Sequence, residues 1–177
     1  GSLTVGGANT TSIVVDGVTD PANIATFVLD ATRNGASITT ENGASTFNVL
    51  TANADDGITA NADLATDNGD LILDGDADGA ADSADRVAVG GGVMISAVGN
   101  LNVDATTNGM RLDGANGTTH TFTSTGDNTV TLGAVTSLDN GNLVVNSENT
   151  LTATSINVGT GSLTLKVDTD GDTAEVN

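Results

Sequence analysis

Short apolar runs with two-residue alternation recur along the whole chain, and clusters of Gly, Asn and Asp separate them. This pattern is typical of β-strands bounded by turns, and six Asn-Gly pairs favour turns with positive φ. The strands predicted in this way are Leu3–Val5, Ser12–Val15, Ser37–Thr39, Thr46–Leu50, Asp70–Leu73, Arg86–Val89, Val93–Ile95, Asn100–Val103, Met110–Leu112, His120–Thr123, Thr129–Leu132, Asn142–Val145, Ser155–Val158 and Ser162–Val167.

Helical periodicity is absent from every window of eleven residues or more. A helix over Pro21–Leu29, capped by Asp20, is the weaker alternative for that segment, because it is rich in β-branched and aromatic residues. The sequence therefore predicts an all-β protein.

A sequence repeat links several of the predicted strands. The pattern Gly-polar-Leu-x-aliphatic begins at Gly69, Gly99, Gly141 and Gly161, and the first residues of the chain fit it too. Its leucines, at positions 71, 101, 143 and 163, are separated by 30, 42 and 20 residues, as coils of variable length would allow. Self-similar short strands favour a parallel β-solenoid (β-helix), in which each coil buries a thin aliphatic strip and stacks on its neighbour.

At roughly 20–25 residues per coil, a single domain over residues 1–177 would contain about seven to nine coils. It is either a whole protein or a segment of a longer repetitive chain. A narrow lumen accounts for the presence of three Phe and no Trp or Tyr. The alternative fold is a tandem pair of immunoglobulin-like β-sandwiches, but their strands are longer and their cores commonly hold a Trp or Tyr.

Charge and composition exclude several function classes. With 4 Lys+Arg against 23 Asp+Glu, the net charge of −19 argues against nucleic-acid binding, and no apolar run is long enough for membrane insertion. The chain has no Cys or Tyr, and its one histidine, His120, fits a surface or hydrogen-bonded role better than a catalytic one. We therefore expect a protein that is not an enzyme, with a polysaccharide-degrading solenoid as the remaining enzymatic alternative.

Residues 74–85 follow the calcium-loop template D-x-[DN]-x-[DN]-G, with Gly79 at the sharp turn. Asp85 takes the twelfth position, where Glu is usual, and no helices flank the loop, so it is not an EF-hand. The alternative is a solvated acidic loop between two strands. The predicted calcium ligands are the carboxylates of Asp74, Asp76, Asp78, Asp82 and Asp85 and the backbone carbonyl of Ala80.

Two further acidic segments carry weaker signals. Asp168, Asp170 and Asp172 alternate as calcium ligands would, although the glycine of this segment is displaced, so an acidic turn is an equal alternative. The looser run from Asp55 to Asp70 is better interpreted as a solvated face.

Residues 137–171, SLDNGNLVVNSENTLTATSINVGTGSLTLKVDTDG, resemble the low-complexity repeats of large secreted bacterial β-solenoid proteins. These include filamentous-haemagglutinin-like adhesins and the acidic proteins of surface layers and biofilm matrices. The resemblance extends over most of the chain and is one of composition and repetition. It implies export, tandem coils and a scaffolding or adhesive role at the cell surface or outside the cell.

A solenoid ends in unpaired strand edges, and neither end of this chain has the sequence of a cap. Because Leu3–Val5 and Ser162–Val167 share the Gly-Ser-Leu-Thr pattern, the end of one copy could continue the start of another. We therefore expect an extracellular, non-enzymatic module that stacks head to tail with itself into a filament, surface layer or biofilm matrix, stabilised by calcium. The alternative is an adhesin or fibre segment that recognises a glycan or cell surface.

Overall fold

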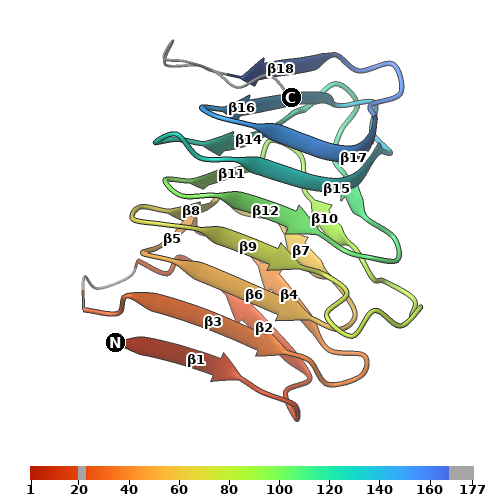
Figure 1. The fold of residues 1–177 in the computed structure, drawn as a ribbon. Helices are drawn as coiled ribbons and strands as arrows, with labels where there is room; N and C mark the ends of the chain where they lie inside the picture. The colour runs from red at the N-terminus through yellow and green to blue at the C-terminus, as the bar shows by residue number, and fades with distance from the viewer. Residues whose placement is uncertain (20–22, 168–177) are drawn as a thin grey trace.

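The computed structural model describes residues 1–19 and 23–167, which form eighteen strands. Every strand pairing among them is parallel, and the strands stack as a β-solenoid of about seven coils, with the N-terminus at the lower end in Figure 1. The predicted solenoid is confirmed, and the immunoglobulin-like alternative is wrong. No helix of the described residues is long and apolar enough to cross a membrane.

Each coil crosses three faces in turn. The first face contains β1 (Ser2–Gly6), β3 (Thr26–Ala31), β6 (Leu50–Ala54), β9 (Leu71–Asp74) and β12 (Leu101–Asp104). The second face contains β2 (Ser12–Val15), β4 (Ser37–Thr40), β7 (Ile58–Ala60), β10 (Val87–Val89) and β13 (Met110–Leu112). The third face contains β5 (Ser45–Phe47), β8 (Leu64–Thr66), β11 (Met94–Ala97), β14 (Thr119–Ser124), β16 (Asn142–Ser147) and β18 (Leu163–Val167).

Two longer strands, β15 (Val130–Ser137) and β17 (Leu151–Asn157), run from the first face onto the second. They join these two faces into one twelve-stranded sheet, whereas the third face is a separate six-stranded sheet. Strand β3 occupies part of the segment for which a helix was the alternative. It forms because Phe27, Leu29 and Ala31 alternate with partly buried positions and point into the core.

The core is the lumen of the solenoid, filled by inward residues stacked in register. Leu71 lies directly beside Leu101 on the first face, as the repeat predicts. Leu143 pairs instead with Leu163 on the third face, so the four repeat leucines form two stacks and not one. A buried aliphatic side chain of this kind contributes about 1.5–3 kcal/mol relative to an exposed one.

All three phenylalanines lie inside the lumen, so the lumen does accommodate aromatic rings. Phe27 and Phe47 meet edge to face with their ring centroids 5.0 Å apart. Phe122 is fully buried on the third face. The narrow lumen therefore limits the number of aromatic side chains in the core but does not exclude them.

Glycine is required where neighbouring coils approach most closely. A Cβ atom on Gly99 would lie 2.4 Å from the backbone carbon of Gly69 in the coil below. This contact is between two backbones, so no side chain can move aside to relieve it.

Candidate metal site

The acidic loop lies at the corner between the first and second faces, between β9 and β10. It lengthens its coil, because Leu71 and its stacking partner Leu101 are 30 residues apart, whereas Leu50 and Leu71 are 21 apart. Gly79 has a φ of 67°, so the sharp turn expected at this position is a left-handed backbone turn. The insertion therefore projects from a solenoid whose stacking continues undisturbed on both sides.

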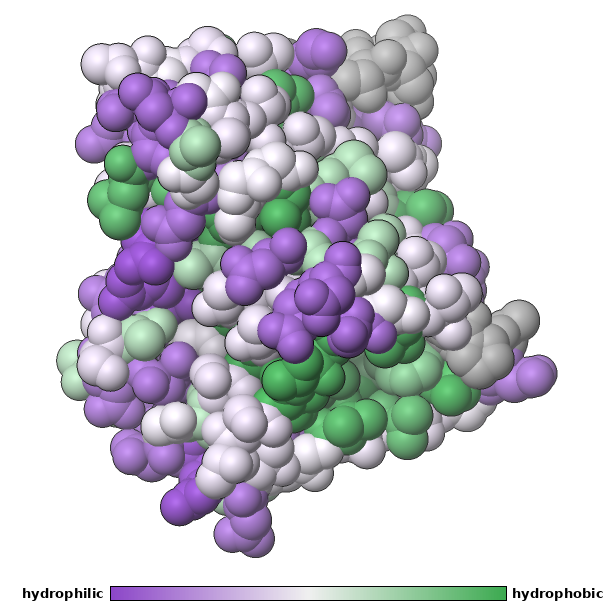
Figure 2. Space-filling view, turned by 180° about the vertical axis from the view of Figure 1, so that it is seen from behind, coloured by the Kyte–Doolittle hydropathy of each residue, from purple (hydrophilic) through white to green (hydrophobic). Residues whose placement is uncertain are grey.

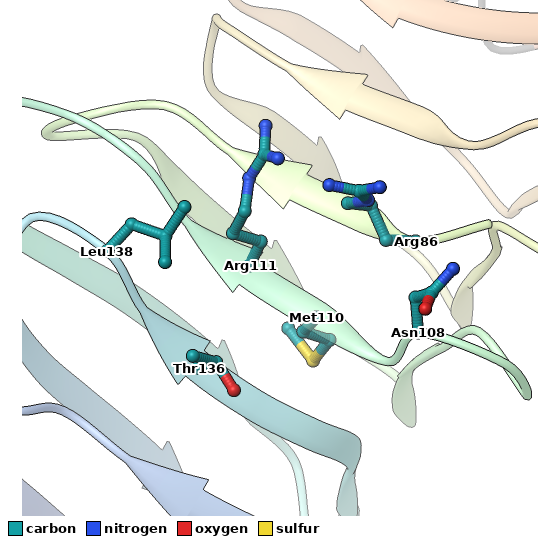
Figure 3. Close-up of a pocket in the computed structure, with 6 residues that line it drawn as sticks. All are labelled: Arg86, Asn108, Met110, Arg111, Thr136 and Leu138. Carbon is teal, nitrogen blue, oxygen red and sulfur yellow. The ribbon is translucent and has the colours of Figure 1, made fainter. Parts of the chain in front are cut away.

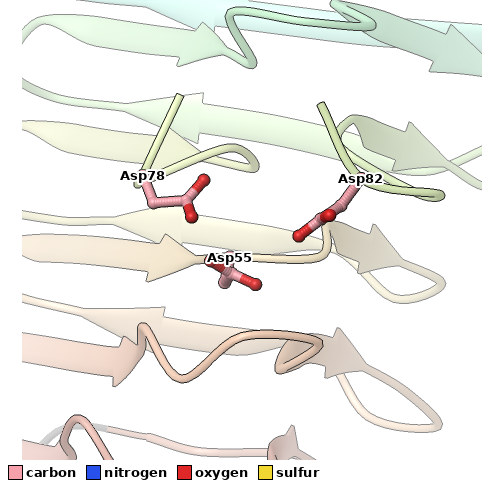
Figure 4. A group of neighbouring side chains, drawn as sticks. All are labelled: Asp55, Asp78 and Asp82. Atoms are coloured by element: carbon pink, nitrogen blue, oxygen red, sulfur yellow. The ribbon is translucent and has the colours of Figure 1, made fainter. Parts of the chain in front are cut away.

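Three carboxylates converge at this corner: those of Asp55, Asp78 and Asp82 (Figure 4). One oxygen from each lies within 4.8 Å of the other two. Two oxygens bound to one Ca²⁺ at about 2.4 Å lie no more than about 4.8 Å apart, so the spacing fits a shared calcium ion. Asp78 and Asp82 belong to the loop, whereas Asp55 follows β6 in the preceding coil.

Two more predicted ligands, Asp76 and Asp85, are buried in the same loop. Asp76 accepts a hydrogen bond from the backbone of Thr107 at 2.7 Å, and Asp85 accepts one from the backbone of Asp82. The second carboxylate oxygen of each is buried without a hydrogen-bond partner among the described residues. A buried carboxylate oxygen without a donor is energetically costly, and a bound cation would satisfy it.

Two other predicted ligands, Asp74 and Ala80, contribute no carboxylate to the cluster of Asp55, Asp78 and Asp82. Asp74 ends β9, accepts a hydrogen bond from the backbone of Asp76, and is adjacent to Asp104 across the parallel pair. Ala80 is exposed, and its N–H donates to Asp78 at 2.8 Å. The second predicted cluster, Asp168, Asp170 and Asp172, lies outside the described residues.

The electrostatics of the corner reflect this crowding of negative charge. Burial raises the pKa of Asp55, and the carboxylates of Asp78 and Asp82 raise it further, against a hydrogen bond from the backbone of Gly35. Desolvation, followed by the charges of Asp85 and Asp78, raises the pKa of Asp82. The ionised carboxylates therefore repel one another, and a divalent cation between them would remove that repulsion.

The interpretation of Asp55 as part of a solvated face is wrong, because its side chain is buried beneath the loop. The position of Asp55 beneath the loop could have been inferred from the length of the coil between the two strands. In the parallel register Asn53 pairs with Asp74, so Asp55 stands one coil below the start of the insertion. That register becomes visible only once the coils are aligned face by face.

His120 is a lumen residue and not a surface one. Its Nε2 lies 3.1 Å from a carboxylate oxygen of Asp139, and its Nδ1 is buried without a partner among the described residues. Thr118 and Ser137 also donate to this carboxylate, at 2.8 and 2.7 Å. The group is enclosed by stacked coils, so we assign it a structural role.

Comparison of the chain with protein-family models, with curated proteins and with solved structures gave no significant match. The chain is a β-solenoid repeat protein by its fold, and a fold alone does not define a function.

Proposed function

We propose that this chain is an extracellular structural module that stacks end to end with copies of itself and is stiffened by calcium. The observation that carries the proposal is the exposure of inward-facing residues in the first and last strands that the structure describes. Leu3 and Val5 of β1 are 39% and 40% exposed, and Leu163 and Leu165 of β18 are 43% and 46% exposed. Stacked equivalents in the middle of the solenoid are almost completely buried.

The space-filling view shows apolar surface on the side of the molecule that faces away from the viewer in Figure 1. In Figure 2, which shows the molecule from behind, hydrophobic surface gathers in the lower part, towards the N-terminal coils. A free parallel edge also leaves backbone N–H and C=O groups without ladder partners. Covering such an end with another coil would satisfy both the backbone and the apolar strip.

The faces determine how two copies would meet. The first described strand lies on the first face, and β17 and β18 of the last coil cross all three faces. In a stacked pair, β1 and β2 of one copy would therefore pair with the two halves of β17 in the other. The shared Gly-Ser-Leu-Thr pattern does not bring Leu3 onto Leu163, because these residues lie on different faces.

Charge favours the same contact. The first coil, residues 1–19, contains a single acidic residue, Asp16, and residues 151–167 contain none and one cation, Lys166. The large negative charge is therefore carried elsewhere in the chain, including the four acidic residues of segment 168–177. The described residues of the two end coils therefore add little electrostatic repulsion of their own.

The proposed calcium site is the corner between the first and second faces, where three carboxylates converge. An ion held by Asp78 and Asp82 of the loop and by Asp55 of the coil below would tie two consecutive coils together. When bound, calcium supplies a positive charge to a cluster of carboxylates that otherwise repel one another. The ion would therefore stiffen the solenoid against bending and unwinding at this corner.

Assembly is tested by substituting a lumen residue at an end. We expect Leu165→Lys to abolish the particles longer than one copy that the unmodified chain forms in negative-stain microscopy and sedimentation at rising concentration. Leu138→Lys is the matched control, because Leu138 is 64% exposed on the outside of the solenoid. An unmodified chain that remains monomeric at high concentration contradicts the proposal, as does equal loss of assembly in both variants.

Calcium binding is tested by the sign of the stability change. Asp78→Asn and Asp55→Asn remove one charge each, so we expect them to melt at or above the unmodified chain in chelator and below it in calcium. Asp67→Asn is the control, since Asp67 is an exposed acid outside the cluster. If EDTA leaves both the melting temperature and the particle length of the unmodified chain unchanged, the calcium part of the proposal is wrong.

A further inference from the structure

Two hollows lie on the outer surface of the second face, and they share Arg86 and Arg111. The first, about 190 Å³, is also lined by Asn108, Met110, Thr136 and Leu138 (Figure 3). The second, about 170 Å³, contains the acidic residue Asp56 in its lining. The first hollow therefore brings together two of the chain's four cations with no acidic residue in its lining.

Arg86 follows the acidic loop, yet it pairs with no carboxylate of the described residues within 4.0 Å. One of its terminal nitrogens donates to the backbone carbonyl of Ser83 at 3.0 Å. Its Nε is buried and has no acceptor among the described residues. A buried Nε without an acceptor is energetically costly, and the terminal nitrogens of the same guanidinium, which lines the hollow, can donate charge-assisted hydrogen bonds to an anionic acceptor.

Arg111 stands beside it, because β10 and β13 are neighbouring strands and Ala88 pairs with Arg111. Its Nε and one terminal nitrogen both contact a carboxylate oxygen of Asp113 at 2.7 Å. This ion pair holds the Arg111 side chain in place and neutralises part of its charge. The hollow therefore contains Arg86, which has no carboxylate partner in the described part of the chain, and Arg111, which Asp113 orients and partly neutralises. Together these groups leave about one positive charge, which suits a ligand with a single anionic group.

The geometry points to a binding site for a saccharide that carries an isolated carboxylate, such as a uronic acid among neutral sugars; we propose this site as a property separate from end-to-end stacking. The planar guanidinium fork matches a carboxylate. The side chains of Asn108 and Thr136 can hydrogen-bond sugar hydroxyls at the same hollow. The volume is below the roughly 300–1,000 Å³ of a pocket that encloses a drug-sized ligand, and suits one sugar ring.

The overall charge restricts the ligand further. A chain of net charge −19 repels polyanions such as nucleic acids or fully charged polyuronates at long range. A ligand with one carboxylate avoids most of this repulsion and still gains the local contact with Arg86. The hollow therefore favours a ligand with a single negative charge over both neutral ligands and polyanions.

The probe is glucuronate, titrated into the isotopically labelled protein in calcium at constant ionic strength and followed by the backbone amide signals. We expect saturable shifts of the amides of Arg86 and Met110, with no comparable shifts from glucose and weaker binding of acetate. Arg86→Gln should weaken binding by roughly tenfold or more. Arg86→Lys keeps the positive charge but loses the planar guanidinium. It should bind glucuronate more weakly than the unmodified chain and more tightly than Arg86→Gln.

Arg33→Gln is the matched control, because it removes the same charge from an exposed arginine in another loop. It should leave glucuronate binding unchanged, and circular dichroism should show that each variant keeps the solenoid. An absence of saturable glucuronate shifts at millimolar concentrations overturns the proposal, as does equal weakening by Arg33→Gln. Acetate binding as tightly as glucuronate would overturn the saccharide assignment and indicate a pocket for a protein carboxylate.

Discussion

The buried carboxylate of Asp139 allows a prediction whose size follows from the structure. It lies at the corner between β15 and β16 and is 7% exposed. Burial alone raises its pKa, but hydrogen bonds to its charged form outweigh burial and lower the pKa from 3.8 to about 2. The donors are the hydroxyls of Ser137 and Thr118, the ring of His120 and the backbone N–H of Gly141.

A pKa that falls on folding means that the folded protein binds this proton more weakly than the unfolded chain does. The carboxylate therefore stabilises the fold at every pH well above 3.8, and the contribution disappears as the pH falls through about 2. The difference between 3.8 and about 2 corresponds to about 2 kcal/mol of unfolding free energy. Asp139→Asn removes this titration, because an amide does not ionise in this pH range. It also lowers the stability at higher pH, because a neutral amide is a weaker acceptor for the four hydrogen bonds than a carboxylate.

The assay is urea unfolding in chelator at pH 6 and at pH 2, with Asp67→Asn as the surface control. We expect the unmodified chain to exceed Asp139→Asn in unfolding free energy at pH 6, and the gap to shrink by about 2 kcal/mol at pH 2. A gap of constant size across this pH range would refute the assigned hydrogen-bond network.

Three further predictions concern the corner, the coil spacing and the lumen. In chelator, the melting temperature should rise as the pH falls from 7 towards 4. The reason is that the pKa values of Asp55 and Asp82 are raised, so ionisation of these two carboxyl groups destabilises the fold at higher pH. Added calcium should abolish this trend in thermal scans. Gly99→Ala should lower the unfolding free energy by about 2 kcal/mol or more in urea titrations, because the new Cβ would overlap the backbone of the adjacent coil. Phe122→Ala should cost about 3–5 kcal/mol in the same measurement, and Leu138→Ala, on the exposed surface, about 0.5 kcal/mol or less.

Much of the fold could be predicted from local pattern. Alternation over three to five residues identifies most of the strands, and the spacing of Leu71 and Leu101 gives their true register. The assignment of strands to faces could not be predicted in the same way. The pattern that precedes Leu71 on the first face also precedes Leu143 on the third, because both positions need a tight corner followed by an inward leucine.

The candidate metal site could be predicted only in part, because its residues come from two segments of the chain. The loop template depends on consecutive residues, so it identified Asp78 and Asp82 together with residues that the fold turns elsewhere, such as Asp74. Asp55 comes from the coil below and reaches the site only because parallel stacking places it there. Contacts between coils depend on the exact length of each coil, which varies with insertions that no local pattern fixes.

The distribution of charge along the axis separates the two parts of the proposed function. Carboxylates crowd a corner in the middle of the solenoid, whereas the described end coils are nearly neutral and apolar. Salt screens repulsion between carboxylates but does not weaken the burial of aliphatic side chains. In chelator, added salt should therefore recover much of the thermal stability that calcium supplies, without preventing ends from meeting. Filaments that need calcium at every salt concentration would instead indicate that the ion lies between copies and not between coils of one copy.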